Sequence, residues 1–578
     1  MDTMIENPTI ITDAESLDSL QVQFVIEDEQ EQRDYILYLL GMHEENDIDS
    51  KSINDLCQIN KSFRFLWNLF SFLKKPFTIL REDQYVDRVF RDSYYYYYSH
   101  KHFPYERNCS RIFLFDFQMD RLFSEYSLEN LNKGFIGTVT IRPLPELAIG
   151  RSLLNPGYFF TKYPAYVRLG KYHVTCFGRR LTVRAFPFSM QDGETTTCAE
   201  ITVLNIFDYY GQTYSDYHFI LPSDIKRMAE RFNFERSWPT KGLRYEALTR
   251  VFTEAEYFPR LYSIDKIAPH RFRQFLHYYI ESGIPVAIGF DIDGTTRHSV
   301  IGIGHGKTEL IKEELPLYAT RVNKTDRSFW FYDTSDMVDD YCIMDDNRLP
   351  YTIFENNKDD KTFSVDRVDE TQDSLPIHNI DTSLRIPAKD YRVNTFMVPL
   401  HRHMYLEAGD AYDIFIKIAA DTEAGIRRHF PNVGKKESPA ILRIFMASSK
   451  TFRKVRHKHF ENGLKNAQAI YDAMSFPRFI WICEIYTEDS YKKETPKAIG
   501  EIVIDATASP DMKMKSYLLL HYGNELSVHN LSSSDIGRNR TTRQINSLVF
   551  KRFIGDSEEF DSYTGNLFKC KKYGNFTI

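Results

Sequence analysis

Residues 191–211 constrain the fold more than any other segment, because they combine a helix start, a helix face and a reactive side chain. Thr197 and Glu200 have the Thr-x-x-Glu spacing of a capping box, which predicts Thr197 as the N-cap. Gly211 suits the position just past the helix end. Cys198 then lies in the first turn, where unpaired N–H groups and the helix dipole favour a thiolate. The apolar residues that follow recur at helical spacing: Ile201, Val203, Leu204, Ile206, Phe207 and Tyr210.

Length and composition indicate a soluble protein of several domains. A chain of 578 residues exceeds what one core usually supports, so we expect about two to four domains. The net charge of −7 argues against nucleic acid as the main partner. The first residues resemble no signal peptide and no apolar run could span a bilayer, so we expect a cytoplasmic protein without a membrane partner. Seven scattered cysteines without a Cys-x-x-Cys pair predict neither a disulfide framework nor a zinc ribbon.

The pattern of elements divides the chain into three parts and indicates an α+β fold. Residues 1–160 are predicted to form an N-terminal α/β accessory domain, 161–400 the central domain, and 401–578 a C-terminal α+β accessory domain. In the first part we expect helices at about 29–40 and 53–73 and strands at 111–117 and 134–143. The tyrosine run 94–98 could form an aromatic recognition platform, but we favour a half-buried element.

The central part alternates between helical and strand patterns. A hairpin is predicted within 166–188 around Gly178, and helices at about 223–232, 244–253 and 270–282. The apolar run 284–290 is typical of a buried strand. A turn at Asp293-Gly294 and a strand over 298–306 follow. Residues 356–392 are expected to be a loop or an insertion before a strand at 393–400. The C-terminal part predicts helices at about 407–420 and 454–474 and strands at 479–486, 499–505 and 516–521.

Nucleophilic catalysis by a cysteine requires a base and a group that orients the base. His298 is the best candidate base, because it opens a strand directly after a turn. Asp345 is the preferred orienting residue, since it ends a strand and is followed by a turn and Pro350; Asp346 and Asp333 are the alternatives. Gln191, together with the Cys198 backbone N–H, could donate to an oxyanion.

This order of residues resembles the papain-like cysteine peptidases, and within them the compact bacterial branch that includes bacteriocin-leader-processing peptidases. His298-Ser-Val-Ile-Gly-Ile-Gly-His-Gly306 is similar to the superfamily's His-Ala-Val-x-x-Val-Gly-Tyr-Gly segment, and residues 341–351 look like the strand bearing the third catalytic residue. The resemblance covers about residues 165–400. Gln191 lies one residue further from Cys198 than is usual, and the long interval from His298 to Asp345 requires an insertion.

The resemblance implies a central papain-like domain, in which the cysteine-bearing helix packs on an antiparallel sheet bearing the histidine and aspartate. It implies a bacterial thiol hydrolase that cleaves a peptide or isopeptide bond of a peptide or protein substrate through Cys198, His298, Asp345 and Gln191. Two alternatives remain: an acyl transferase of the transglutaminase or arylamine-acetyltransferase type, and a non-enzymatic binding module on the same frame. Neither a cofactor nor a metal is expected, and the oligomeric state is not predicted.

One further motif is the basic run 450–459, Lys-Thr-Phe-Arg-Lys-Val-Arg-His-Lys-His. It could contact phosphates, but a solvated helix face is the favoured interpretation on an acidic protein. The pairs His401/His403 and His457/His459 lack the spacing expected of metal ligands.

Overall fold

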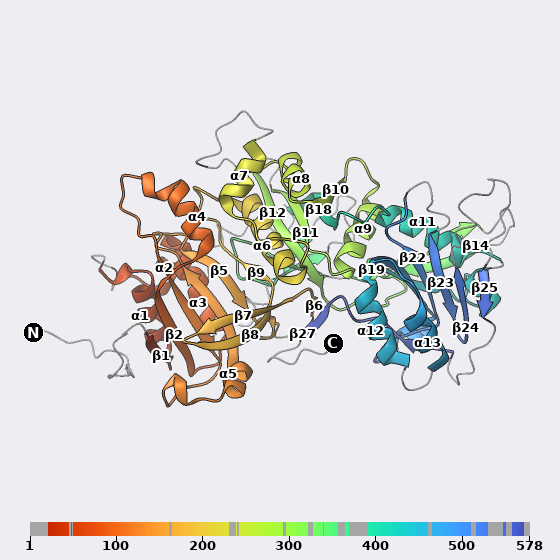
Figure 1. Ribbon diagram of the computed structural model, residues 1–578, viewed down its shortest axis with the longest axis horizontal. Helices are drawn as coiled ribbons and strands as arrows, with labels where there is room; N and C mark the ends of the chain where they lie inside the picture. The colour runs from red at the N-terminus through yellow and green to blue at the C-terminus, as the bar shows by residue number, and fades with distance from the viewer. Residues whose placement is uncertain are drawn as a thin grey trace, which may run out of the picture.

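The computed structural model shows an α+β chain built on three main sheets (Figure 1). The structure describes the following residues: 21–44, 48, 50–160, 165–230, 239, 242–292, 296–321, 328–338, 340–356, 365–368, 391–422, 424–460, 465–509, 516–529, 547–550 and 558–570. Within these ranges, no helix combines the length and apolar character needed to cross a membrane.

The N-terminal sheet is antiparallel, with the strand order β1-β2-β3-β4-β5-β9. Alternate side chains of β3 point to opposite faces, as the pleat requires. Ile112 and Leu114 belong to the core beneath the helices α1 and α3, whereas Phe113 and Phe115 pack with the hairpin β7–β8 on the other face. The elements of this part are β1 (Gln21–Ile26), α1 (Glu29–Leu39), α2 (Ile53–Ile59), α3 (Lys61–Ser71), β2 (Phe77–Tyr85), α4 (Arg88–Tyr96), β3 (Cys109–Phe115), α5 (Leu128–Gly134), β4 (Phe135–Ile141), β5 (Ile149–Leu154), β7 (Gly170–Cys176), β8 (Arg179–Ala185) and β9 (Pro187–Phe188).

The central sheet has the order β10-β18-β11-β12-β15-β16-β17, and its pairs are antiparallel. Helix α6 shares a core with Ile301 and Ile303 of β12, and helix α9 shares one with Val300, so the two helices cover opposite faces. The elements are β6 (Ala165–Val167), α6 (Cys198–Thr213), α7 (Pro222–Glu230), α8 (Tyr245–Glu254), β10 (Tyr257–Ser263), α9 (Pro269–Glu281), β11 (Val286–Ile292), β12 (Thr296–His305), β15 (Asp340–Met344), β16 (Thr352–Asn356), β17 (Val365–Val368) and β18 (Tyr391–His401).

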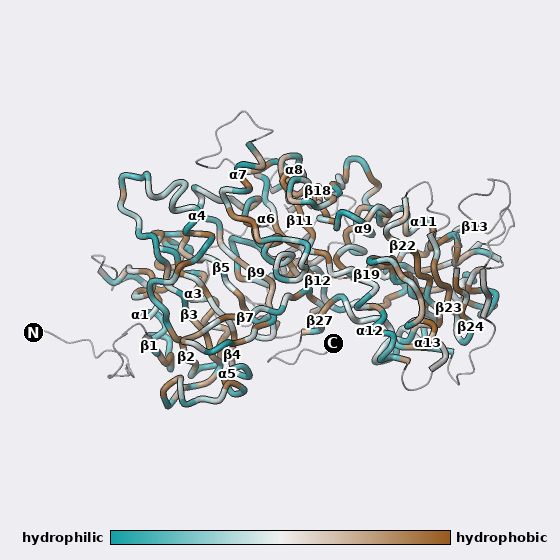
Figure 2. The backbone as a smooth tube through the Cα atoms, in the orientation of Figure 1, coloured by the Kyte–Doolittle hydropathy of each residue, from teal (hydrophilic) through white to brown (hydrophobic). Residues whose placement is uncertain are grey.

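The third sheet has the order β13-β14-β19-β20-β22-β23-β24-β25. Its core strands are hydrophobic on both faces, and β22 and β23 are correspondingly brown in Figure 2. Helix α11 covers one face and helices α12 and α13 the other. The elements of this sheet and its covering helices are β13 (Tyr318–Arg321), β14 (Ser328–Asp333), α11 (Ala408–Ala419), β19 (Ala440–Ser448), α12 (Ser449–Phe460), α13 (Lys465–Ala473), β20 (Phe479–Tyr486), α14 (Glu488–Tyr491), β22 (Gly500–Asp505), β23 (Tyr517–Tyr522), β24 (Glu525–His529) and β25 (Ser547–Phe550). The same part of the chain also contains β21 (Lys497–Ala498) and β26 (Phe560–Asp561), which pair with each other, and β27 (Phe568–Cys570).

Strand pairing crosses the predicted domain boundaries at three places. β9 joins the N-terminal sheet, although it belongs to the central part of the chain. The hairpin β13–β14 joins the third sheet, where β14 pairs in parallel with β19. β27, near the end of the chain, joins the central sheet through β6, as its blue ribbon beside β6 shows in Figure 1. The three predicted parts therefore share sheets across their boundaries.

Most predicted elements lie within two residues of the observed ones, and the differences have local causes. The helix predicted over 53–73 is interrupted, because Asn60 accepts hydrogen bonds from the N–H groups of Ser62 and Phe63, both at 2.9 Å, and so caps a second helix. The predicted end at Gly211 is wrong: α6 continues to Thr213. A Cβ at Gly211 would lie 3.1 Å from the Phe219 backbone nitrogen, so this glycine permits a close backbone approach.

Three further predictions meet different outcomes. The helix predicted over 454–474 is two helices, α12 and α13, with residues 461–464 between them. The tyrosine run is half-buried as favoured, since Tyr98 is 2% exposed whereas Tyr95 and Tyr96 are more than half exposed. The turn at Asp293-Gly294 and most of the loop over 356–392 lie outside the described residues.

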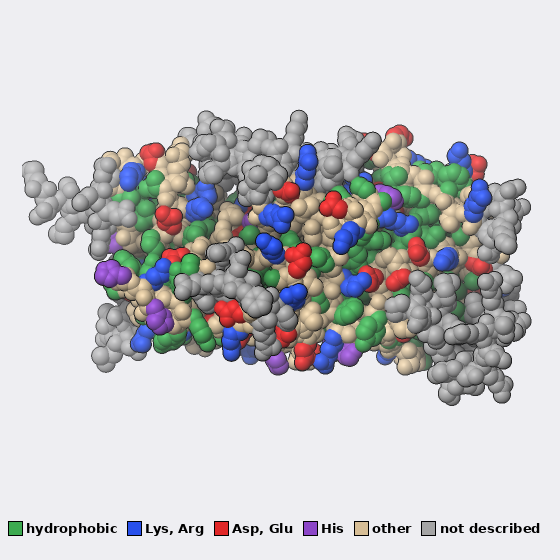
Figure 3. All heavy atoms as spheres, turned by 90° about the horizontal axis from the view of Figure 1, so that it is seen from above, with side chains coloured by type: hydrophobic (Ala, Val, Ile, Leu, Met, Phe, Trp, Pro, Cys, Tyr) green, Lys and Arg blue, Asp and Glu red, His purple; other side chains and the backbone are tan. Residues whose placement is uncertain are grey.

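On the surface seen from above, basic and acidic side chains are interspersed among the described residues, and no broad patch of one sign is visible on this face (Figure 3). A nucleic-acid surface would instead show clustered Lys and Arg side chains. This view therefore gives no support to nucleic acid as a partner.

Candidate functional site

The predicted capping box forms at the start of α6. The backbone N–H of Thr197 donates to Glu200 Oε2 at 3.1 Å, and its hydroxyl donates to the same oxygen. Glu200 is 1% exposed, and Lys226 of α7 neutralises it through an ion pair of 2.7 Å. Cys198 is therefore held in the first turn of a rigidly capped helix, and it is partly exposed.

Asp192 shapes the loop that leads to the cysteine. One of its carboxylate oxygens accepts hydrogen bonds from the N–H groups of Glu194, Thr195 and Thr196 at 3.0, 2.7 and 2.8 Å. Gly193 adopts a positive φ of 76°, which favours glycine. These bonds fix the path of the backbone between Gln191 and Cys198.

His298 is the third residue of β12, not the first as predicted, and it lies opposite Phe290 of β11. On the other side of β12, Met344 of β15 pairs with Ile301. The residue after Met344, at the end of β15, consequently lies beside the first residues of β12. That residue is Asp345, and its Oδ1 is 2.8 Å from His298 Nε2.

The carboxylate of Asp345 is buried and heavily hydrogen-bonded. It accepts the N–H of Asn347 at 3.0 Å, and Arg348 Nε lies 3.0 Å from its second oxygen. Burial raises the pKa of Asp345, but the charge and hydrogen bond of His298 and the charge of Arg348 outweigh it, so the pKa lies well below the usual range. Asp345 is therefore ionised at neutral pH.

The environment of His298 favours the imidazolium. Burial lowers the pKa of His298, but the charge and hydrogen bond of Asp345, a hydrogen bond with Cys198 and the charge of Asp346 raise it well above its ordinary value. Since Nε2 faces Asp345, Nδ1 is the nitrogen left for the cysteine. His298 is thus bonded to Asp345 through Nε2 and keeps Nδ1 for the neighbouring Cys198.

Packing of α6 on the sheet explains this convergence. Thr202, one turn beyond Cys198, donates its hydroxyl to the carbonyl of Ser299 at 3.4 Å, and Ser299 follows His298. Tyr245 of α8 also reaches this place, since its hydroxyl donates to Ser299 Oγ at 3.3 Å. The proximity of Cys198 is one of the influences that raise the pKa of Tyr245, after burial.

Gln191 lies at the other side of the aspartate turn. Its Nε2 donates to Asn347 Oδ1 at 3.1 Å, and the amide retains a second donor. Arg142 holds the backbone here by donating to the carbonyls of Met190 and Gln191 at 3.1 and 3.3 Å. The predicted oxyanion role of Gln191 stays a prediction.

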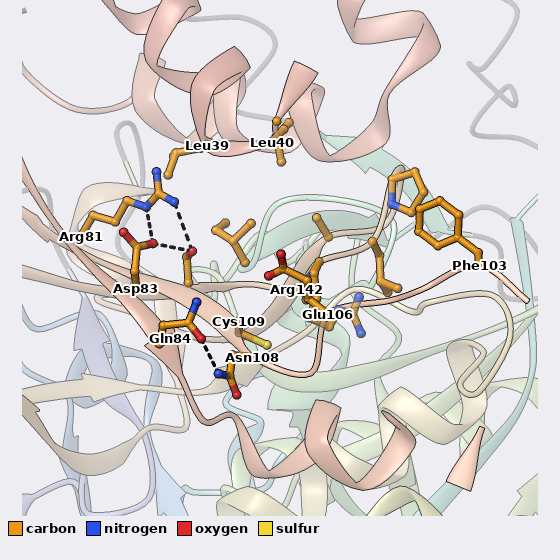
Figure 4. A pocket seen from close by; sticks show the side chains of 17 residues that line it. Leu39, Leu40, Arg81, Asp83, Gln84, Phe103, Glu106, Asn108, Cys109 and Arg142 are labelled. Carbon is orange, nitrogen blue, oxygen red and sulfur yellow. Dashed lines mark hydrogen bonds and ion pairs between the residues drawn. The ribbon is translucent and has the colours of Figure 1, made fainter. Parts of the chain in front are cut away.

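Arg142 also lines a cavity of about 540 Å³ in the N-terminal part, shown in Figure 4. Arg81, Asp83 and Ser110 form a hydrogen-bonded cluster on one of its walls, and Asn108 bonds to Gln84. The cavity wall and the backbone before Cys198 therefore share one arginine side chain.

The two alternatives to Asp345 occupy different positions. Asp346 Oδ1 is 3.7 Å from His298 Nε2, beyond a hydrogen bond. Asp333 ends β14 in the third sheet, where it accepts hydrogen bonds from Tyr278 and, at 3.4 Å, from Gln274. Asp345 is thus the carboxylate hydrogen-bonded to His298.

His298, Asp345 and Asp346 also form a group whose three ligand atoms lie within 4.8 Å of one another. Burial and the charge of Asp345 raise the pKa of Asp346 to about 7, against the opposing charge of His298. A metal ion here would have to replace the His298–Asp345 hydrogen bond. The geometry therefore fits an oriented imidazole better than a metal centre.

Sequence reasoning missed Asn347, Arg348, Tyr245 and Lys226. Arg348 could have been found, because Asp345 and Arg348 are three residues apart around a turn. Tyr245 and Lys226 carry no local signal, since only tertiary packing brings α8 and α7 to the start of α6.

Comparisons with protein-family models, curated proteins and solved structures each found no match.

Proposed function

We propose that the chain is a papain-like thiol hydrolase that cleaves a peptide or isopeptide bond. One observation carries the proposal: His298 is hydrogen-bonded to Asp345 at 2.8 Å, and the bond from Thr202 to Ser299 holds the start of α6, which bears Cys198, against the same end of β12. Thiolate, base and orienting carboxylate are the parts that nucleophilic cysteine catalysis requires. The family resemblance supports the same reading.

In the proposed mechanism, His298 holds the proton of Cys198 and the thiolate attacks the acyl carbon. Asp345 stabilises the imidazolium and fixes the ring so that Nδ1 faces the sulfur. His298 then gives its proton to the leaving amine, which leaves an acyl-enzyme on Cys198. Water, deprotonated by His298, releases the acid and restores the thiol.

Charge on the tetrahedral intermediate needs donors aimed at the oxyanion. The backbone N–H of Cys198 in the first helical turn is one candidate donor. The free amide hydrogen of Gln191 is the second, and the Asp192 loop together with Arg142 would hold both groups in position.

The test begins with the cysteine. The alkylation rate of Cys198 by iodoacetamide is measured from pH 4 to 10, with His298→Ala as the partner variant. We expect fast alkylation at pH 6 in the wild type and slow alkylation in His298→Ala. Equal alkylation rates in the wild type and in His298→Ala would limit the resemblance to the fold and would favour a non-enzymatic binding module.

Substrate turnover follows with a peptide library and Cys198→Ala as the control. Cleavage that persists in Cys198→Ala would refute the assignment. Product analysis with an added primary amine separates hydrolysis from acyl transfer, because only a transferase would convert most of the acyl-enzyme into the amide.

A further inference from the structure

A second cavity, of about 530 Å³, lies where the end of α6, the turn before β11 and the start of α12 meet. Its lining residues come from both the central and the C-terminal parts of the chain. A volume of this size is typical of small-molecule sites. No residue in the described lining is acidic, although the chain as a whole is acidic.

Three basic side chains line the cavity: Arg168, Lys450 and Arg478. Arg478 pairs with Asp216, which compensates one charge. Arg168 donates to the hydroxyl of Tyr209 and, at 2.7 Å, to the carbonyl of Asn566, but it forms no ion pair within the described part of the chain. Lys450 is exposed and likewise has no acidic partner among the described residues.

The described partners of Arg168 are two neutral oxygens, so a bound anion would supply the opposite charge that this half-buried arginine lacks there. His401 also lines the cavity, but burial lowers the pKa of this histidine, so it adds a neutral ring at pH 7. The described site therefore carries a surplus of two positive charges, from Arg168 and Lys450.

The remaining polar lining consists mainly of residues with hydroxyl groups. A hydroxyl group can donate to a phosphate oxygen, as arginine and lysine also do. Ser282 already donates to the carbonyl of Tyr278, and Ser215 donates to Asp216 at 3.4 Å. The hydroxyl donors that the site can offer to a phosphate are therefore those of Ser449 and Thr451, at the start of α12 beside Lys450. Tyr210 and Tyr214 stack with centroids 5.5 Å apart and add a flat aromatic wall.

We propose that this cavity binds a small soluble molecule that carries two or more phosphate groups. Lys450 and Arg168 contact the phosphates, and the hydroxyl groups complete the hydrogen bonds. The basic run that begins at Lys450 then has one residue with a ligand role, whereas Lys458, further along the same helix and outside the cavity lining, belongs to the solvated face. The proposal is independent of the function of Cys198.

The test is isothermal titration calorimetry of the full chain with tripolyphosphate, inorganic phosphate and ATP at low and at physiological salt. We expect saturable binding of tripolyphosphate that weakens with salt and is much tighter than binding of inorganic phosphate. Lys450→Ala should weaken it about 10-fold, as expected for a lost charge-assisted hydrogen bond. Tighter binding of ATP than of tripolyphosphate would identify the aromatic wall as a base site.

Lys458→Ala is the matched control, since it removes the same charge from the same helix. Equal weakening by Lys450→Ala and Lys458→Ala would show diffuse attraction to the helix and overturn the proposal, as would the absence of binding by the wild type at millimolar tripolyphosphate. Arg168→Gln should abolish binding; Arg168→Lys, which keeps the charge, should restore part of it, so a folding defect is distinguishable from a lost contact.

Discussion

Replacing Asp345 by asparagine should uncouple the reactivity of Cys198 from His298. In the wild type, the carboxylate 2.8 Å from Nε2 raises the pKa of His298, which favours the imidazolium at neutral pH. In Asp345→Asn, the largest influence that raises the pKa of His298 is lost, whereas burial still lowers it, so the imidazolium is disfavoured. Cys198 then loses its counter-ion, and the less reactive thiol form predominates.

The magnitude follows from the distance between the charges. Two unit charges with centres about 4 Å apart interact by about 4 kcal/mol at an effective dielectric constant near 20. Without this attraction the imidazolium is less stable, and so is the thiolate that it would hold in the proposed mechanism. Allowing for solvent relaxation and residual hydrogen bonding, we expect alkylation by iodoacetamide to slow about 30-fold at pH 6.5 and less than about 3-fold at pH 9.5, where any cysteine is largely ionised.

Two isosteric variants serve as controls. Asp346→Asn removes a carboxylate 3.7 Å from Nε2 and should change the rate at pH 6.5 only a few-fold. Asp333→Asn lies in the third sheet and should leave the rate unchanged. Wild-type alkylation at pH 6.5 in Asp345→Asn, or the largest loss in Asp333→Asn, would refute the assignment of the orienting residue.

Three other substitutions test the frame of the site. Lys226→Met should lower the free energy of unfolding by about 3–5 kcal/mol, because it removes the buried cation that lies 2.7 Å from the Glu200 carboxylate. Urea titration should show partial recovery in Glu200→Gln/Lys226→Met, and no loss in the single variant would contradict the pairing. Burial lowers the pKa of His277 to about 3. The stability that the protein gains from keeping this histidine neutral is therefore fully present above pH 6.5 and is lost as the pH falls towards 3. As the pH is lowered, the free energy of unfolding of His277→Gln should therefore fall less steeply than that of the wild type, with a difference of up to about 1.4 kcal/mol per pH unit. Parallel plots of the free energy of unfolding against pH would refute this. Gly304→Ala should lower the free energy of unfolding, measured by chemical denaturation, by about 1–3 kcal/mol, since the new Cβ would lie 2.1 Å from the Tyr166 carbonyl oxygen. An unchanged free energy of unfolding would show that β6 can move aside without loss of stability.

Local signals were enough to predict the helix start at Cys198 and the strand end at Asp345. A capping box acts within four residues, and a strand end is marked by the polar turn that follows, so both can be read without knowing the fold. The pairing of His298 with Asp345 needed one more step, the adjacency of two strands, which the family resemblance supplied. The observed hydrogen bond agrees with that expectation.

Features that depend on distant segments could not be read in this way. Gly211 looked like a helix end, but the backbone of residues 218–219 passes close to it and the helix continues. The predicted strand that ends at Asp333 exists, yet its sheet partner β19 begins more than one hundred residues later. Patterns of hydrophobicity define a strand but do not name its neighbours.

The position of β27 has a consequence for biosynthesis. Its three residues complete the edge of the central sheet beside β6, although most of that sheet has been made by residue 401. At usual elongation rates, roughly 10–30 s separate the two events. During that interval, the sheet that carries His298 has an open edge on β6, a ready template for a strand from another chain. The pairing of β27 with β6 therefore closes this edge only after the rest of the central sheet has been synthesised.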